Sequence, residues 1–206
     1  MKEPTNLVQI FCKAPRVGEV KTRLIPGLEP GGAEKAATLY ESMVERVVTG
    51  LRNLPGTATV IHMPVQDESY FLRFKLPLYT QQGSNLGQKM CHALRSGLED
   101  YDRVVLLGTD CPLIDAEYIE HAFEALDDHD VVLGPAEDGG YGLVGVSQRV
   151  PEMFDDIDWG TDVVLSQTCR KLNQLRVNYA LLPLVWDVDR PGDLPRYQAW
   201  LAGLKS

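Results

Sequence analysis

The segment 13–24, KAPRVGEVKTRL, gathers four cations within a short stretch: Lys13, Arg16, Lys21 and Arg23. Only Glu19 opposes them locally. Lysine supplies a compact positive charge and arginine a two-pronged donor, and both suit the oxygens of a phosphate. Gly18 lets the backbone turn or approach a ligand closely. The segment is therefore a candidate phosphate-binding loop, although a solvated basic loop would have the same composition.

Acidic residues follow two apolar runs later in the chain. Asp110 comes shortly after the run VVLL at 104–107, and Asp187 and Asp189 follow the run that ends at Trp186. In open α/β sheets ligands bind beyond the carboxyl ends of strands, and Mg²⁺ takes one or two carboxylates together with phosphate oxygens. Asp110 could instead make a turn before Pro112, and the later pair could complement the dipole of a helix beginning at Pro191. We expect at most one of that pair to face the same metal as Asp110.

Three further segments could line a ligand. The segment 134–142, GPAEDGGYG, combines glycines with two acids, which suits hydroxyls, an amine or a metal but also suits a hairpin turn. The segment 82–87, QGSNLG, opens a predicted helix whose amides favour an anion or a base edge. Trp159-Gly160-Thr161 opens another predicted helix. Structural caps explain the last two segments about as well as ligand binding does.

Composition narrows the class of partner. The chain has 206 residues, a formal net charge of −9 and 44% hydrophobic residues, which suits one globular domain over residues 1–206. An acidic protein is a poor ligand for nucleic acid or membranes, so a small phosphorylated molecule fits the local cations better. The four cysteines are scattered, the histidines share no metal spacing, and no run is long enough for a signal peptide or a membrane span. We expect a cytoplasmic protein with reduced thiols.

These motifs can come together only if several strands end at the same edge of a sheet. Strand-like and helix-like patterns alternate, which predicts an α/β sheet with helices on both faces. The predicted strands are 7–11, 57–63, 77–80, 103–108, 131–133, 141–146 and 179–185. The predicted helices are 33–53, 85–99 with Leu86 inward, one capped by Asp115, 161–175 capped by Thr161, and one beginning at Pro191.

Taken in order, the basic loop, TDCP, EDGGY, WGT and DVDxPxDL resemble the CofC-like, or selenodomain-associated, transferase family. The resemblance runs from about residue 9 to residue 201, and the motifs are specific as a set rather than singly. That family belongs to the glycosyltransferase-A-like superfamily and is related to 2-phospholactate guanylyltransferase. The resemblance implies a single-domain Rossmann-like sandwich with a mixed, mostly parallel sheet.

The resemblance also implies roles for individual residues. Lys13, Lys21 and Arg23 would be the catalytic contacts to nucleotide phosphates, and Asp110 and Asp189 would hold Mg²⁺ or Mn²⁺. Further nucleotide contacts would come from Thr22, Gln82, Asn85 and Gly87. The acceptor side would be lined by Glu137, Asp138, Gly139, Gly140, Trp159 and Thr161. The family usually has Asp where Asn85 stands and Arg where Lys89 stands, which bears on nucleotide preference more than on catalysis.

Three functions compete at this stage. The first is nucleotidyl transfer from a nucleoside triphosphate to a small phosphorylated or phosphonate acceptor, with release of pyrophosphate. The second is glycosyl transfer from a nucleotide sugar, which ranks lower because Asp110 is followed by Cys111-Pro112 and the D-x-D pattern lies elsewhere, at Asp187 and Asp189. The third is a nucleotide-binding module without catalysis. The same fold serves the two reactions, so fold alone does not choose between them.

Overall fold

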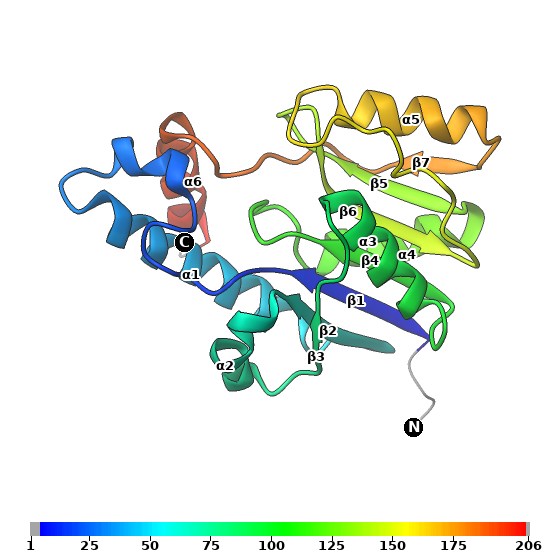
Figure 1. Ribbon diagram of the computed structural model, residues 1–206, viewed down its shortest axis with the longest axis horizontal. Coiled ribbons are helices and arrows are strands. Elements are labelled where there is room, and N and C mark those ends of the chain that lie inside the picture. Colours follow the sequence, from blue (N-terminus) through cyan, green and yellow to red (C-terminus); the bar gives the residue numbers. More distant parts are fainter. Residues whose placement is uncertain (1–4, 205–206) are drawn as a thin grey trace.

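A computed structural model describes residues 5–204, so the ends of the expected 1–206 domain lie outside the described residues. Seven strands form one sheet in the order β3-β2-β1-β4-β6-β5-β7 (Figure 1). Neighbouring strands run parallel except at β6, which is antiparallel to both β4 and β5. The strands are β1 Asn6–Phe11, β2 Thr57–Met63, β3 Leu78–Thr80, β4 Arg103–Leu107, β5 Val131–Pro135, β6 Tyr141–Ser147 and β7 Tyr179–Leu181. The expected mixed, mostly parallel sheet is confirmed.

Helices cover both faces of the sheet because alternate strand residues point to opposite sides. On one face Val8 and Ile10 of β1 share a core cluster with α1 and α4, and on the other Leu7 shares one with α3. Leu172 of α5 belongs to the second cluster. The α-helices are α1 Gly32–Leu51, α2 Glu68–Phe71, α3 Leu86–Gly97, α4 Ala116–Asp128, α5 Val164–Gln174 and α6 Leu194–Gly203. Short 3₁₀ turns cover η1 Thr22–Gly27, η2 Val65–Asp67, η3 Leu72–Phe74 and η4 Pro191–Asp193.

A third apolar cluster joins the basic loop to the end of the chain. Leu24 of η1 packs with Met43 of α1 and with Trp186, Val188, Leu194 and Tyr197. Figure 1 shows α6 away from β5 and β7, and its Trp200 lies against Arg46 of α1. Because Leu24 and Val188 are fully buried, this cluster fixes the basic loop against the segment that carries Asp187 and Asp189.

Four expectations about elements are wrong in detail. α5 begins at Val164, and Thr161 does not cap it, because its hydroxyl donates to the carbonyl of Asp158 at 2.7 Å. β7 ends at Leu181, two residues before Pro183, rather than running to Val185. Leu86 is exposed rather than inward. The stretch 65–74, left without an element, forms η2, α2 and η3.

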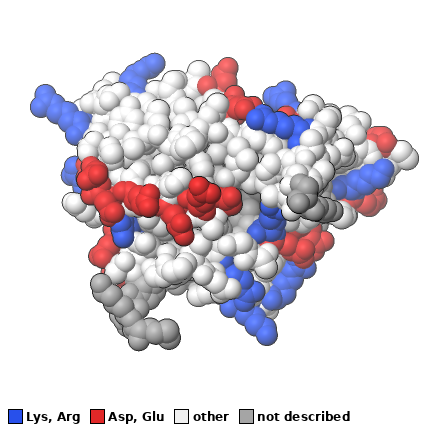
Figure 2. All heavy atoms as spheres, turned by 180° about the vertical axis from the view of Figure 1, so that it is seen from behind, with Lys and Arg blue, Asp and Glu red and all other residues white. Residues whose placement is uncertain are grey.

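One side of the surface carries charges of both signs. On the side seen in Figure 2, Lys and Arg are scattered among acidic and uncharged side chains and form no continuous basic face. Such a face is what nonspecific nucleic-acid binding requires. Within residues 5–204 no helix is long and apolar enough to cross a bilayer.

Candidate functional site

The basic loop and Asp110 meet at the carboxyl ends of two adjacent strands. β1 leads into the loop, β4 leads to Asp110, and the two strands are parallel neighbours. Lys21 Nζ lies 2.9 Å from Asp110 Oδ2. The Lys21 side chain is only 4% exposed, so this is a largely buried cation with a specific carboxylate partner. Lys21 also adopts the left-handed backbone conformation, at φ 48°, where the chain turns into η1.

The segment after β7 brings a second carboxylate to the same loop. Arg23 Nη1 donates to Asp189 Oδ2 at 2.7 Å, and this hydrogen bond and the charge of Asp189 raise the pKa of Arg23. The amide of Val188 donates to the carbonyl of Asp110 at 3.0 Å, which ties the two acidic segments together. The structure therefore pairs each of two candidate phosphate-binding cations with one of the two candidate metal ligands.

Asp187 belongs to the same group of charges. Burial, together with the nearby charge of Asp138, raises the pKa of Asp187 to about 6, and Lys21 opposes this rise. Asp138 comes from the loop between β5 and β6, so that loop also reaches the site. The sequence left Asp187 and Asp189 as alternatives across a continuing strand. Residues two apart in an extended segment share one face, however, so alternation does not separate the two acids. Asp189 pairs with Arg23, and Asp187 interacts electrostatically with Asp138 and Lys21.

The group has the donors for a metal that keeps other ligands of its own. Asp110 Oδ1 is buried and has no hydrogen-bond partner in the structure, so it retains a free lone pair for a cation. Among residues 5–204 no group of three or more Asp, Glu, His or Cys side chains forms a ready metal cage. One or two carboxylates completed by phosphate oxygens and water is the usual arrangement for Mg²⁺. The residues present fit that arrangement.

The 136–140 loop is a tight hairpin, as the alternative reading of its sequence anticipated. The Ala136 amide donates to the Gly140 carbonyl at 3.0 Å, and Gly139 has φ 87°. A Cβ on Gly139 would lie 2.1 Å from the Asp162 carbonyl oxygen, so no other residue fits there. Glu137 forms a two-pronged ion pair with Arg196 of α6, at 2.7 and 3.0 Å. Glu137 is thus engaged with α6, which leaves Asp138 as the acid nearest the cations.

The remaining candidates divide between the two sides of this cluster. Lys13 is exposed at the start of the loop, and its amide donates to the hydroxyl of Tyr40 at 3.1 Å. Thr22 opens η1 and is exposed. The inward spacing of Tyr40 in α1 was readable from the sequence, but its contact with the Lys13 amide was not.

The start of α3 and the 159–161 segment form a second group. Asn85 caps α3 as predicted, accepting from the Gln88 amide at 2.9 Å, and Gln82 is exposed just before it. A Cβ on Gly87 would lie 2.9 Å from the Trp159 ring, so the helix start and this tryptophan are in close contact. Trp159 packs against Tyr141 and Phe154, with ring centroids 6.3 and 6.2 Å away. Among residues 5–204 no hydrogen bond or ion pair joins Gln82, Asn85, Gly87, Trp159 or Thr161 to the charged cluster.

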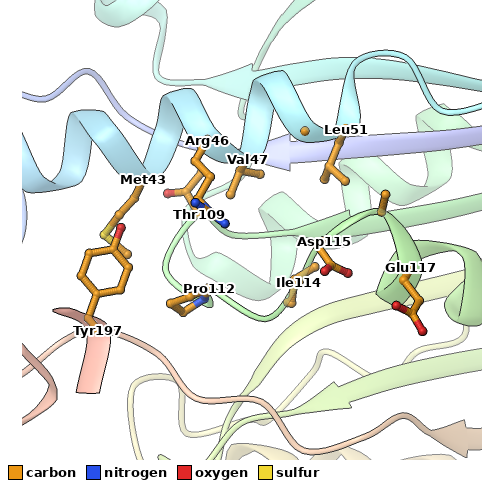
Figure 3. Close-up of a pocket in the computed structure, with 12 residues that line it drawn as sticks. Met43, Arg46, Val47, Leu51, Thr109, Pro112, Ile114, Asp115, Glu117 and Tyr197 are labelled. Atoms are coloured by element: carbon orange, nitrogen blue, oxygen red, sulfur yellow. The ribbon is translucent and has the colours of Figure 1, made fainter. Parts of the chain in front are cut away.

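Two cavities lie beside this site rather than in it. The first, of about 370 Å³, has Met43, Val47 and Leu51 of α1 on one wall and Pro112 and Ile114 on the other (Figure 3). It approaches the charged cluster only through Thr109, the neighbour of Asp110. The second, of about 490 Å³, lies along α3 and includes Gly87. Neither cavity is lined by Lys21, Arg23 or the acids at 110, 187 and 189.

Comparisons with known proteins identify the family and the fold. The family model described as "Uncharacterized protein conserved in bacteria (DUF2064)" matches residues 53–161. No curated protein matches the chain. A solved structure from Desulfovibrio desulfuricans G20, provisionally described as a nucleotide-diphospho-sugar transferase, is 35% identical, with a TM-score of 0.82 over 90% of this chain and 82% of that one.

Two more distant structures show the same fold with different nucleotides. A CMP:2-keto-3-deoxy-manno-octonic acid synthetase complexed with CTP is 13% identical, with a TM-score of 0.58 over 96% of this chain and 98% of that one. A mannosyltransferase from Pyrobaculum calidifontis in complex with GDP-Man and Mn²⁺ is 12% identical, with a TM-score of 0.50 over 90% of this chain and 57% of that one. At these identities the likeness shows the shared glycosyltransferase-A-like fold alone.

Proposed function

The chain belongs to the DUF2064 family and is a transferase with the nucleotide-diphospho-sugar transferase fold, and we propose that the group it transfers is a nucleotidyl group. The donor is a nucleoside triphosphate, and the acceptor is a small molecule that carries a phosphate or phosphonate. Pyrophosphate is released. The observation that carries the proposal is the pairing of Lys21 with Asp110 and of Arg23 with Asp189 at the carboxyl edge of the sheet.

That pairing suits a triphosphate better than a simple anion. The two cations would bind phosphate oxygens, while the two acids, which would repel a bare anion, need a cation between them and the phosphates. Lys13, exposed at the loop start, adds a third positive charge. A polyphosphate accompanied by a divalent cation satisfies both sets of charges at once.

The reaction then requires correct positioning of the donor and acceptor and involves no covalent intermediate with the protein. An acceptor oxygen attacks the α-phosphorus, a new P–O bond forms, and the bond from the α-phosphorus to the bridging oxygen of the β-phosphate breaks in line with it. Lys21 and Arg23 stabilise negative charge on the departing pyrophosphate and on the α-phosphate oxygens. Asp138 and the glycines at 139 and 140 border the acceptor side.

Asp110 and Asp189, with Asp187 beside them, would hold Mg²⁺ or Mn²⁺. Such an ion polarises phosphoryl oxygens and neutralises charge that develops during transfer. The distant relative with Mn²⁺ supports a divalent ion in this fold. The four free thiols of the structure fit a reducing compartment, which supports a cytoplasmic location.

A binding screen tests the proposal. Each of the common nucleoside triphosphates and nucleotide sugars is added with and without Mg²⁺, and the melting temperature is followed. A ligand at about a hundredfold its Kd should raise Tm by roughly 5–10 °C in a chain of this size. Lys21→Met should abolish the shift, whereas Lys171→Met, which removes a surface lysine paired with exposed Asp156, should preserve it. Absence of a shift with every triphosphate would overturn the proposal.

Glycosyl transfer is the second candidate, because the relative from Desulfovibrio desulfuricans G20 is described as a nucleotide-diphospho-sugar transferase. The D-x-D at 187–189 flanks fully buried Val188 and supplies one acid to Arg23. A nucleotide-sugar shift without any triphosphate shift would favour this reaction.

A further inference from the structure

We propose that Asp67, far from the basic loop in the sequence, positions the phosphate-binding Lys13 through the backbone of that loop. The inference rests on the proposed function for the identity of the ligand. Asp67 is the last residue of η2, which follows β2. None of the motifs found in the sequence includes it. Its carboxylate nevertheless reaches the loop 53 residues earlier.

The Asp67 carboxylate has two partners, and both belong to the loop. Oδ2 accepts from the Ala14 amide at 2.9 Å, and Oδ1 lies 2.6 Å from Arg16 Nη2. Arg16 also donates to the carbonyl of Gln66 at 2.8 Å, so it is bound to the Asp67 segment at two points. Arg16 therefore holds the loop to the Asp67 segment through one charged and one uncharged acceptor.

Lys13 lies between two other fixed amides. The Cys12 amide donates to the His62 carbonyl at 3.1 Å, the Lys13 amide to Tyr40 Oη at 3.1 Å, and the Ala14 amide to Asp67. Three consecutive amides are thus held by β2, by α1 and by η2. With its backbone fixed on both sides, the Cα–Cβ bond of Lys13 has a set direction, which limits the region that its ammonium can reach.

A local structural role does not account for Asp67. The residue stands at the N-cap of α2, but its side chain makes no capping bond there. It is only 4% exposed, and a buried carboxylate is retained only when its charge is compensated. Both compensating groups come from the loop, so the buried charge holds the loop rather than the helix.

Two substitutions of Asp67 distinguish its contact with the Ala14 amide from its contact with Arg16. Asp67→Asn keeps an acceptor for the Ala14 amide and loses the charge that holds Arg16, whereas Asp67→Ala loses both. Glu68→Gln is the matched control, because it removes one negative charge from the exposed neighbouring position. Circular dichroism establishes that each variant is folded at the temperature of the assay.

The first measurement is hydrogen exchange of the peptide that contains Ala14, which needs no nucleotide. We expect faster exchange in Asp67→Ala than in Asp67→Asn, and wild-type exchange in Glu68→Gln. Unchanged exchange in Asp67→Ala would overturn the inference whatever the protein binds.

The second measurement is the Kd of the best-binding nucleoside triphosphate with Mg²⁺, in wild-type and Lys13→Ala backgrounds. Asp67→Ala should weaken binding roughly tenfold or more in the wild-type background, since misplacing a group by about 1 Å can cost about 10²-fold. In the Lys13→Ala background the same change should cost less than about threefold, because the two residues act through one contact. Equal losses in both backgrounds would overturn the positioning role. If the wild-type protein binds no triphosphate while exchange still responds to Asp67→Ala, the proposed function fails and the loop anchor stands.

Discussion

Lys21 and Arg23 each have two possible kinds of partner. In the structure each is paired with a carboxylate, at 2.9 and 2.7 Å, and in the proposed reaction each binds phosphate oxygens. The exchange of partners is favourable only if the released carboxylates find a cation. At the scale of single residues, the account therefore couples nucleotide binding to the divalent ion.

Asp110→Asn should change nucleotide affinity in opposite directions with and without metal. In EDTA the variant frees Lys21, so the triphosphate should bind roughly two- to fivefold more tightly, the scale of one partly exposed ion pair. With Mg²⁺ it should bind roughly tenfold or more weakly, because loss of a metal ligand is at least as damaging as loss of a group that supports one. Calorimetric titration in both buffers measures the two constants.

Asp100→Asn is the control for this pair of measurements, because Asp100 is exposed and lies away from the cluster. It should leave both constants unchanged. A variant at Asp110 that weakens binding in both buffers would show that the carboxylate does not compete with phosphate for Lys21.

Lys21→Met should lower the rate of transfer by about 10²–10³, the typical effect of removing one preorganised donor to developing charge. Lys171→Met should retain the wild-type rate. Initial rates at saturating triphosphate provide the measurement, and a loss below about tenfold would remove Lys21 from the catalytic group.

At the scale of elements, the predictable parts are those with a strong apolar pattern. β2 has the predicted bounds, and α1, α3 and α4 begin within a residue or two of their expected starts. The stretch 65–74 was missed because Val65 and Leu72 are 64% and 63% exposed, which hides any helical period. Thr161 was misassigned because a hydroxyl that can cap a helix can equally bond the preceding turn.

The candidate site likewise has parts that the sequence predicted and parts that it did not. Parallel strands end at one edge, so the meeting of the basic loop with Asp110 followed from the order of motifs. Asp67 could not be found, because its contact with Ala14 spans 53 residues and carries no periodic signal. The sequence also allowed Asp187 and Asp189 to act together, because residues two apart in an extended segment share one face.

Asn85→Ala should destabilise the protein by about 1 kcal/mol, because it removes the side-chain acceptor for the Gln88 amide at the start of α3. Asn85→Asp, the residue usual in the resembling family, keeps an acceptor and adds a charge that the helix dipole favours, so stability should be equal or slightly higher. Denaturant unfolding gives both values. If Asn85→Ala and Asn85→Asp lowered the free energy of unfolding equally, the side-chain acceptor at the N-cap would contribute nothing.

His62 of β2 should make stability depend on pH. Burial lowers the pKa of His62 to about 4, with a smaller contribution from His92, whereas the unfolded chain titrates near 6.5. Between these values the unfolded state binds more protons, so stability is present above about pH 6.5 and is lost as the pH falls toward 4. The contribution is on the order of 3 kcal/mol.

His62→Phe should remove that part of the pH dependence and retain the ring packing against Phe11 and Tyr79. Unfolding free energies at pH 7 and pH 4 for both proteins measure it. His121→Asn, at an exposed position of α4, should keep the wild-type slope. A His62→Phe variant with the wild-type slope would contradict this assignment.

At the scale of the whole molecule, the site is assembled from most of the chain. The cations come from residues 13–23, the acids from 110, 138 and 187–189, and the third apolar cluster ties the last segment to the first. The fold class was predictable because alternating elements specify a sheet with helices on both faces. The reaction was not, because this fold carries both nucleotide transfer and sugar transfer.

The most direct test of the central claim is to measure which phosphate product the protein releases. Purified protein is incubated with each nucleoside triphosphate, Mg²⁺ and a panel of phosphorylated and phosphonate acceptors, and pyrophosphate is assayed alongside consumption of triphosphate. The account predicts one pyrophosphate per triphosphate consumed, with the product lost in EDTA and sharply reduced in Lys21→Met. Release of nucleoside diphosphate from a nucleotide sugar, with no pyrophosphate from any triphosphate, would contradict it.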